Sequence, residues 1–159
     1  MRIAIGCDEA AYNLKQIIIQ HLDNQNGFSL EDFGSYNGEK VLYPEVAERV
    51  ARAVADGRFD RGILMCGTGI GMAITANKVP GIRAAVCHDP FSAERSRKSN
   101  NAQILCMGER VVGSELAKYL VDIWLRCDFL GGTSTPKVEK ITEIEQQYYT
   151  KTIPCKETK

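Results

Sequence analysis

Short apolar runs alternate along this chain with stretches whose apolar residues recur at helical spacing. The runs predict five β-strands, at residues 2–7, 28–33, 62–66, 82–87 and 103–107. The intervening stretches predict helices over 12–22 and 44–54, just after residue 69, from Pro90 onward, and over 114–125 and 137–149. Strands that alternate with helices favour an α/β fold, in which helices cover both faces of a five-stranded parallel sheet.

The length of 159 residues predicts a single domain, which we place at 1–149 and follow with a polar tail at 150–159. Twenty basic side chains balance twenty acidic ones, which argues against nucleic acid or an anionic membrane as the main partner. No apolar run approaches the roughly 18 residues of a membrane span. The N-terminal segment predicts a strand rather than a signal peptide, so we expect a cytoplasmic protein.

Six cysteines are many for this length, but no pair forms the Cys-x-x-Cys spacing of common zinc sites. Cys7, Cys87 and Cys106 lie in apolar runs, where a thiol behaves as a small buried hydrophobe. Cys66 differs from them because a glycine-rich segment follows it directly.

That segment, Cys66-Gly67-Thr68-Gly69-Ile70-Gly71, connects the third strand to the next helix. Alternate glycines let a backbone approach a ligand closely, and the free N–H groups of a helix start can hold an anion. Gly71 is followed by Met72, which excludes both a Walker loop and a Cys-x5-Arg phosphatase loop. The spacing also departs from the dinucleotide fingerprint. A tight strand-to-helix turn without chemistry remains the alternative.

A thiol in such a place can act as a nucleophile or as a general base, because a helix N-terminus lowers its ordinary pKa of about 8.5. A nucleophile usually needs a histidine partner, and the chain has only two. His21 is expected on the surface of the first helix, whereas His88 either lines the site or is an ordinary turn residue. Proton transfer by Cys66 is therefore favoured, and a metal site is poorly supported.

Other polar residues follow or precede the predicted strands. Asp8 and Glu9 could bind sugar hydroxyls, although Asp8 could equally cap a helix. Tyr43 could place its phenol over the cleft or simply pack. Ser99 and Asn100 supply neutral polar groups before the fifth strand. The candidate phosphate cations, each of which could also be a plain surface charge, are Arg83, Arg110 and Lys137.

Several motifs together resemble the type B ribose 5-phosphate isomerase family, which includes galactose 6-phosphate isomerase subunits. They are Gly6-Cys7-Asp8, Tyr43-Pro44, the long segment from Cys66 to Asp89, Asn100-Asn101-Ala102 and the segment from Gly108 to Gly113. The resemblance implies a Rossmann-like α/β/α sandwich and aldose–ketose isomerisation of a sugar phosphate without cofactor or metal. It also implies a homodimer or homotetramer with active sites shared between subunits.

By the same resemblance, Cys66 is the base that acts through a cis-enediol(ate), and Thr68 handles hydroxyl protons. The amides of Gly67, Gly69, Ile70 and Gly71 would stabilise the enediolate oxygen. Asp8 and the partner subunit's Asn100 would hold sugar oxygens. Some relatives use a glutamate at the position of Met72, so this chain is similar to the cysteine-type enzymes.

The chain departs from the family where the substrate would be bound. Glu9 and Ser99 stand where the family has histidines that bind phosphate and open the sugar ring. Thr133 and Lys137 replace two phosphate-binding arginines, while Arg110 is retained. The segments 92–95 and 99–103 are more similar to tetrulose 4-phosphate isomerases. The alternatives are a non-catalytic sugar-phosphate-binding subunit of a hetero-oligomeric isomerase and, more weakly, a redox thiol protein.

Overall fold

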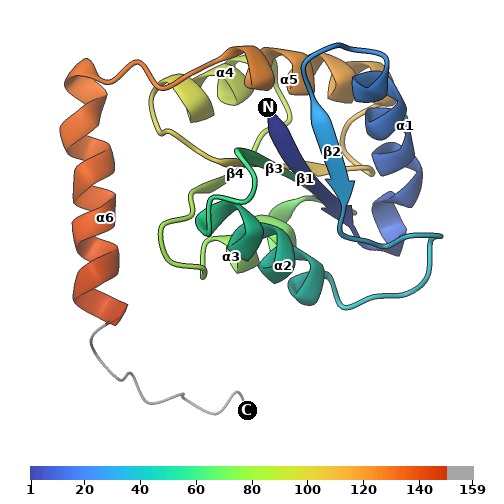
Figure 1. Ribbon diagram of the computed structural model, residues 1–159, viewed down its shortest axis with the longest axis horizontal. Helices are drawn as coiled ribbons and strands as arrows, with labels where there is room; N and C mark the ends of the chain where they lie inside the picture. The colour runs from blue at the N-terminus through green and yellow to red at the C-terminus, as the bar shows by residue number, and fades with distance from the viewer. Residues whose placement is uncertain (150–159) are drawn as a thin grey trace.

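A five-stranded parallel sheet lies at the centre of the computed structural model, which describes residues 1–149 (Figure 1). Its strands are β1 (Arg2–Cys7), β2 (Ser29–Asp32), β3 (Arg61–Cys66), β4 (Ala84–Val86) and β5 (Ile104–Gly108). They run in the order β2-β1-β3-β5-β4, and every neighbouring pair is parallel. All five predicted strands and the α/β class are confirmed, whereas the predicted polar tail at 150–159 lies outside the described residues.

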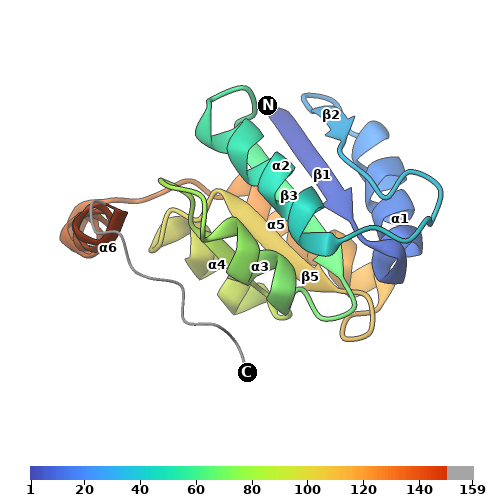
Figure 2. The same ribbon diagram turned by 90° about the horizontal axis from the view of Figure 1, so that it is seen from below.

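Helices cover both faces of the sheet, as Figures 1 and 2 show. One face carries α1 (Tyr12–Asp23), α4 (Pro90–Lys98) and α5 (Ser114–Arg126), and the other carries α2 (Tyr43–Ala55) and α3 (Ile70–Ala76). Two short 3-10 helices, η1 (Glu9–Ala11) and η2 (Gly132–Ser134), precede α1 and α6. The last helix, α6 (Thr135–Tyr149), stands away from the sheet.

Burial of the sheet on both faces divides the apolar core into two layers. Ile3 and Ile5 of β1 point to the α1/α5 layer, and Ala4 between them points to the α2/α3 layer, as strand alternation requires. Gly6 and Gly62 let α2 approach the sheet closely. A Cβ atom at Gly6 would lie 2.7 Å from the Val46 side chain, and one at Gly62 would lie 2.9 Å from Val50.

Helix α6 exposes apolar side chains. Val138 is its one buried residue, whereas Ile141, Ile144 and Tyr148 remain 45%, 47% and 57% exposed. It contacts the body of its own chain through the Glu145 carboxylate, which accepts the Gly81 N–H, and through the Tyr149 hydroxyl, which donates to the Lys78 carbonyl. No helix in the described part of the chain has the length and apolarity needed to cross a bilayer.

A buried arginine joins the start of β3 to the end of α5. The Arg61 side chain donates to the carbonyl oxygens of Trp124 (2.7 Å), Leu125 (3.0 Å) and Cys127 (2.7 Å). It also pairs with Asp128 at 2.7 Å. These bonds satisfy carbonyl groups that the end of a helix leaves without intrahelical partners.

We predict that Arg61→Met lowers the free energy of unfolding by about 2–4 kcal/mol, because buried carbonyl groups would lose their donor. Urea unfolding measures this difference. Arg52→Met is the matched control, since Arg52 is an exposed partner of Glu48 and its loss should cost less than about 0.5 kcal/mol. Equal losses in the two variants would contradict the proposed role of Arg61.

Candidate active site

The carboxyl ends of β1, β3 and β5 bring several predicted site residues to one edge of the sheet. Cys7 pairs in register with Met65, and Cys66 pairs with Gly108. Asp8, the Cys66 loop and Arg110 follow these positions directly. This is the edge at which open parallel sheets bind ligands.

The Cys66 loop is fixed by backbone hydrogen bonds. The Gly69 N–H donates to Cys66 Sγ at 3.1 Å. The carbonyl groups of Cys66 and Gly67 accept the N–H groups of Glu109 (3.0 Å) and Arg110 (3.1 Å). The sulfur therefore has a set position at the tip of β3, and the residue is 6% exposed.

Two glycines of this region have no room for a side chain. Gly69 has a φ of +78°, and a Cβ atom there would lie 2.9 Å from the Met107 backbone. A Cβ atom at Gly108 would lie 2.5 Å from Thr68 Cα. The loop therefore lies directly on the end of β5, and close approach of its backbone to a ligand stays a prediction.

Tyr43 packs against the same loop. Its ring would lie 2.6 Å from a Cβ atom at Gly71, so the simple packing role expected for Tyr43 is present. Thr68 and Ile70 are exposed next to it, and the Thr68 hydroxyl accepts the Ile70 N–H at 3.4 Å.

Asp8 and Glu9 directly follow β1, and both carboxylates accept backbone N–H groups. Asp8 caps η1 through a bond from the Ala10 N–H at 3.0 Å, which confirms the capping alternative. Burial raises the pKa of the Asp8 carboxyl, while the Ala10 bond and the nearby Arg110 oppose that shift. The Glu9 carboxylate accepts the Val41 N–H at 3.4 Å.

Neither histidine hydrogen-bonds to Cys66 among the described residues. His88 Nε2 accepts the Gly108 N–H at 3.1 Å, so His88 is a turn residue bonded to β5, and burial lowers its pKa. His21 lies on α1 with a partly exposed side chain, which pairs with Asp122 on α5 at 2.9 Å. No group of three or more metal-ligating side chains occurs within 1–149.

The remaining candidates lie elsewhere in the chain. Ser99 ends α4, and Asn100 follows it, just before the start of β5. Cys66 pairs with the opposite end of that strand, and a five-residue strand is about 13 Å long. Lys137 lies in the first turn of α6, apart from the sheet. Within one chain, Ser99, Asn100 and Lys137 therefore do not lie beside Cys66.

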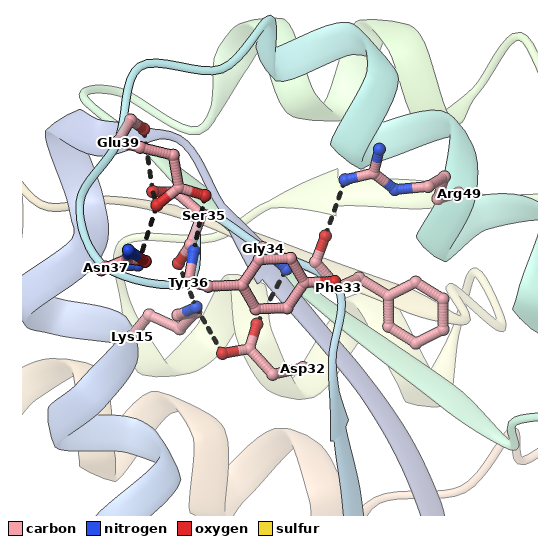
Figure 3. Close-up of polar contacts among 9 residues, drawn as sticks. All are labelled: Lys15, Asp32, Phe33, Gly34, Ser35, Tyr36, Asn37, Glu39 and Arg49. Atoms are coloured by element: carbon pink, nitrogen blue, oxygen red, sulfur yellow. Dashed lines mark hydrogen bonds and ion pairs between the residues drawn. The ribbon is translucent and has the colours of Figure 1, made fainter.

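A polar cluster that was not predicted from the sequence supports this edge (Figure 3). The Lys15 ammonium group is fully buried and lies 2.5 Å from both Asp32 Oδ2 and the Ser35 carbonyl oxygen. The Glu39 carboxylate accepts the N–H groups of Tyr36 (2.9 Å) and Asn37 (2.8 Å). A lysine on the buried stripe of α1, between Leu14 and Ile18, is the sequence signal for this cluster.

The cluster orders the loop that runs from β2 to α2. Cys7 and the loop exchange two backbone bonds of 2.6 Å, from the Cys7 N–H to the Gly34 carbonyl and from the Ser35 N–H to the Cys7 carbonyl. The same loop continues to Val41, which contacts Glu9, and to Tyr43. Lys15 and Glu39 thus hold the backbone beside Asp8.

We predict that Glu39→Gln destabilises the protein at neutral pH and that this loss becomes smaller as the pH falls from about 4 towards 2. The bonds to Tyr36 and Asn37 lower the pKa of Glu39 to about 2, against an ordinary value of about 4.3. The carboxylate therefore contributes stability above about pH 4.3, and that contribution is lost as the pH falls through about 2. Thermal unfolding of both proteins between pH 7 and pH 2.5 tests this, and a constant Tm difference would count against it.

Comparison with known proteins gives a consistent result. Residues 3–141 match the model of the family described as Ribose/Galactose Isomerase. A Listeria innocua protein named ribose-5-P isomerase B is 58% identical over 147 residues, which cover 92% of this chain and 99% of that protein. The D-erythrulose-4-phosphate isomerase of Pectobacterium atrosepticum is 55% identical over 149 residues (92% and 97%). The structure of Clostridium thermocellum ribose-5-phosphate isomerase B superposes with a TM-score of 0.90 at 51% identity (93% and 99%).

Proposed function

The chain belongs to the ribose/galactose isomerase family and is a sugar-phosphate aldose–ketose isomerase, and we propose that Cys66 is its catalytic base. The observation that carries this proposal is the position of the Cys66 sulfur. It lies at the carboxyl edge of the sheet, accepts the Gly69 N–H and has Asp8 and Arg110 near it. The Gly69 N–H thus holds the sulfur in one position at the edge of the sheet where the carboxyl ends of the strands meet.

The proposed reaction moves one proton between two neighbouring carbons. The Cys66 thiolate removes the proton from the carbon next to the carbonyl group, and the electron pair left behind forms a cis-enediolate. The resulting thiol then returns the proton to the other carbon, while Thr68 handles the hydroxyl protons. Amides of the segment from Gly67 to Gly71, apart from the Gly69 N–H that is bonded to Cys66, stabilise the enediolate oxygen, and Asp8 holds a sugar hydroxyl. No step requires a cofactor or a metal ion.

The other thiols are less suited to this role. Burial raises the pKa of Cys7 to about 12 and raises that of Cys106 well above its ordinary value. Both thiols stay protonated near neutral pH and lie within the core.

The five cysteines of the described part are all free, which supports a reducing compartment and hence our expectation of a cytoplasmic location.

A short substrate fits the serine at position 99. Ser99 cannot transfer a proton near neutral pH as an imidazole can. Ribose 5-phosphate is mostly cyclic and must be opened, whereas a tetrose 4-phosphate has its C4 oxygen esterified and cannot close a five-membered ring. We therefore favour interconversion of erythrulose 4-phosphate and erythrose 4-phosphate, in keeping with the name of that relative.

We predict that Cys66→Ala lowers kcat by about 10²-fold or more and leaves KM largely unchanged, because general-base catalysis is worth that much. The assay uses four-, five- and six-carbon sugar phosphates without added metal, and wild type should show its highest kcat/KM on tetrulose 4-phosphate. Cys127→Ala is the control, since this thiol lies at the far end of α5. Near-normal turnover by Cys66→Ala would refute the assignment, and loss of activity to a chelator would refute the metal-free mechanism.

We also propose that two copies of the chain complete each site, in a homodimer or homotetramer. The distance between Asn100 and Cys66 within one chain supports this, because both are expected to contact the same small sugar. Apolar side chains next to the loop support it as well, since Ile70 and Ile74 of α3 are 54% and 57% exposed. The exposed apolar face of α6 would bring Lys137 to the neighbouring subunit.

We predict that mixing inactive Cys66→Ala protein with inactive Asn100→Ala protein restores part of the activity. Some mixed sites would then combine an intact Cys66 from one subunit with an intact Asn100 from the other. The mixture is measured under conditions in which subunit exchange is demonstrated by a mass tag. Exchange without recovery of activity would exclude a shared site, and a strictly monomeric wild type would do the same.

A further inference from the structure

Three basic side chains end α4, and two of them have clear partners within the chain. Arg97 is buried and donates to the Ala102 carbonyl at 2.7 Å and to the Asn101 side chain at 3.1 Å. Lys98 forms an ion pair with Glu94. The guanidinium group of Arg95 instead donates to the neutral hydroxyl of Ser99. Among the described residues no carboxylate lies within 4 Å of the Arg95 guanidinium.

Arg95 also lines a small hollow of about 270 Å³, whose apolar wall is formed by Ala85, Val86 and Cys87 at the end of β4. Ser92, Ser96 and Asn100 contribute the other polar side chains of this hollow. The half-buried guanidinium, the Ser99 hydroxyl and the Asn100 amide therefore lie close together at the end of α4. Such a group of donors around a guanidinium that forms no direct ion pair within the described part of the chain suits a dianionic phosphate, because a guanidinium binds phosphate oxygens with two parallel N–H groups.

We propose that Arg95, together with Ser99, binds the phosphate group of the substrate in the site that contains the neighbouring subunit's Cys66. This inference rests on the proposed function, in which Asn100 holds a sugar oxygen in that site. The phosphate of a four-carbon sugar lies one carbon nearer to the reacting carbons than that of a five-carbon sugar. Arg95, which lies next to Asn100, would thus select the four-carbon sugar phosphate. Its positive charge would also offset the negative charge of Glu9 in the same site.

The test compares wild type with Arg95→Gln, Arg95→Lys and the control Lys98→Gln, which removes a charge from the same helical turn. Steady-state assays with tetrulose 4-phosphate and ribose 5-phosphate give kcat and KM, and inorganic phosphate serves as a competitive inhibitor. We expect Arg95→Gln to raise KM for tetrulose 4-phosphate and Ki for phosphate by 10-fold or more, with kcat within about 3-fold. Arg95→Lys should recover part of both losses, and Lys98→Gln should match wild type.

A purely structural role for Arg95 would lower Tm without moving Ki for phosphate, and that result would overturn the proposal. An equal loss on both sugar phosphates would overturn the selection of the shorter one. If wild type isomerises none of the sugars, the proposed function fails. Calorimetric titration with inorganic phosphate then still tests whether Arg95 and Ser99 bind phosphate. Phosphate binding that is at least 10-fold weaker in Arg95→Gln than in wild type supports the role of Arg95, and equal phosphate binding by wild type and Arg95→Gln refutes it.

Discussion

The direction of the strands is the constraint on which the rest of this structure depends. All five strands are parallel, so every strand-to-helix loop lies at one edge of the sheet and every helix-to-strand loop lies at the other. Cys66, Asp8 and Arg110 follow strands and therefore meet. Ser99 and Asn100 end α4 and precede β5, whereas Cys66 pairs with the last residue of that strand. The proposed site that uses both sets would therefore take them from two subunits.

Rigid support beneath the candidate site comes from groups that carry no chemistry of their own. The buried Lys15 ammonium holds Asp32 and the loop after β2, and Glu39 holds the backbone of that loop. Burying a charge is costly unless it is paired, so the pair of Lys15 and Asp32 also fixes the ends of α1 and β2 relative to each other. The Cys66 loop depends on a different device, which is close packing on glycine.

Patterns that depend on local order were sufficient to predict the strands and the start of α4. The alternation of apolar runs placed all five strands, and α4 begins at Pro90 as expected, where Asp89 caps it by accepting the Ser92 N–H at 2.8 Å. Interactions between distant segments were not predictable in this way. Arg61 reaches carbonyl groups more than sixty residues away, and His21 pairs with Asp122 across two helices. The glycines of the Cys66 segment are conspicuous in the sequence, but the contact of Gly69 with β5 follows only from the order of the strands.

The lengths of the strands have a consequence for behaviour at high concentration. The two edge strands, β2 and β4, have four and three residues, whereas the inner strands have five or six. A short edge offers few unpaired backbone groups on which another chain could add a strand, so open-ended aggregation through the sheet is suppressed. Self-association is thereby left to the helical surfaces, which have defined shapes and can end in a closed assembly of fixed size.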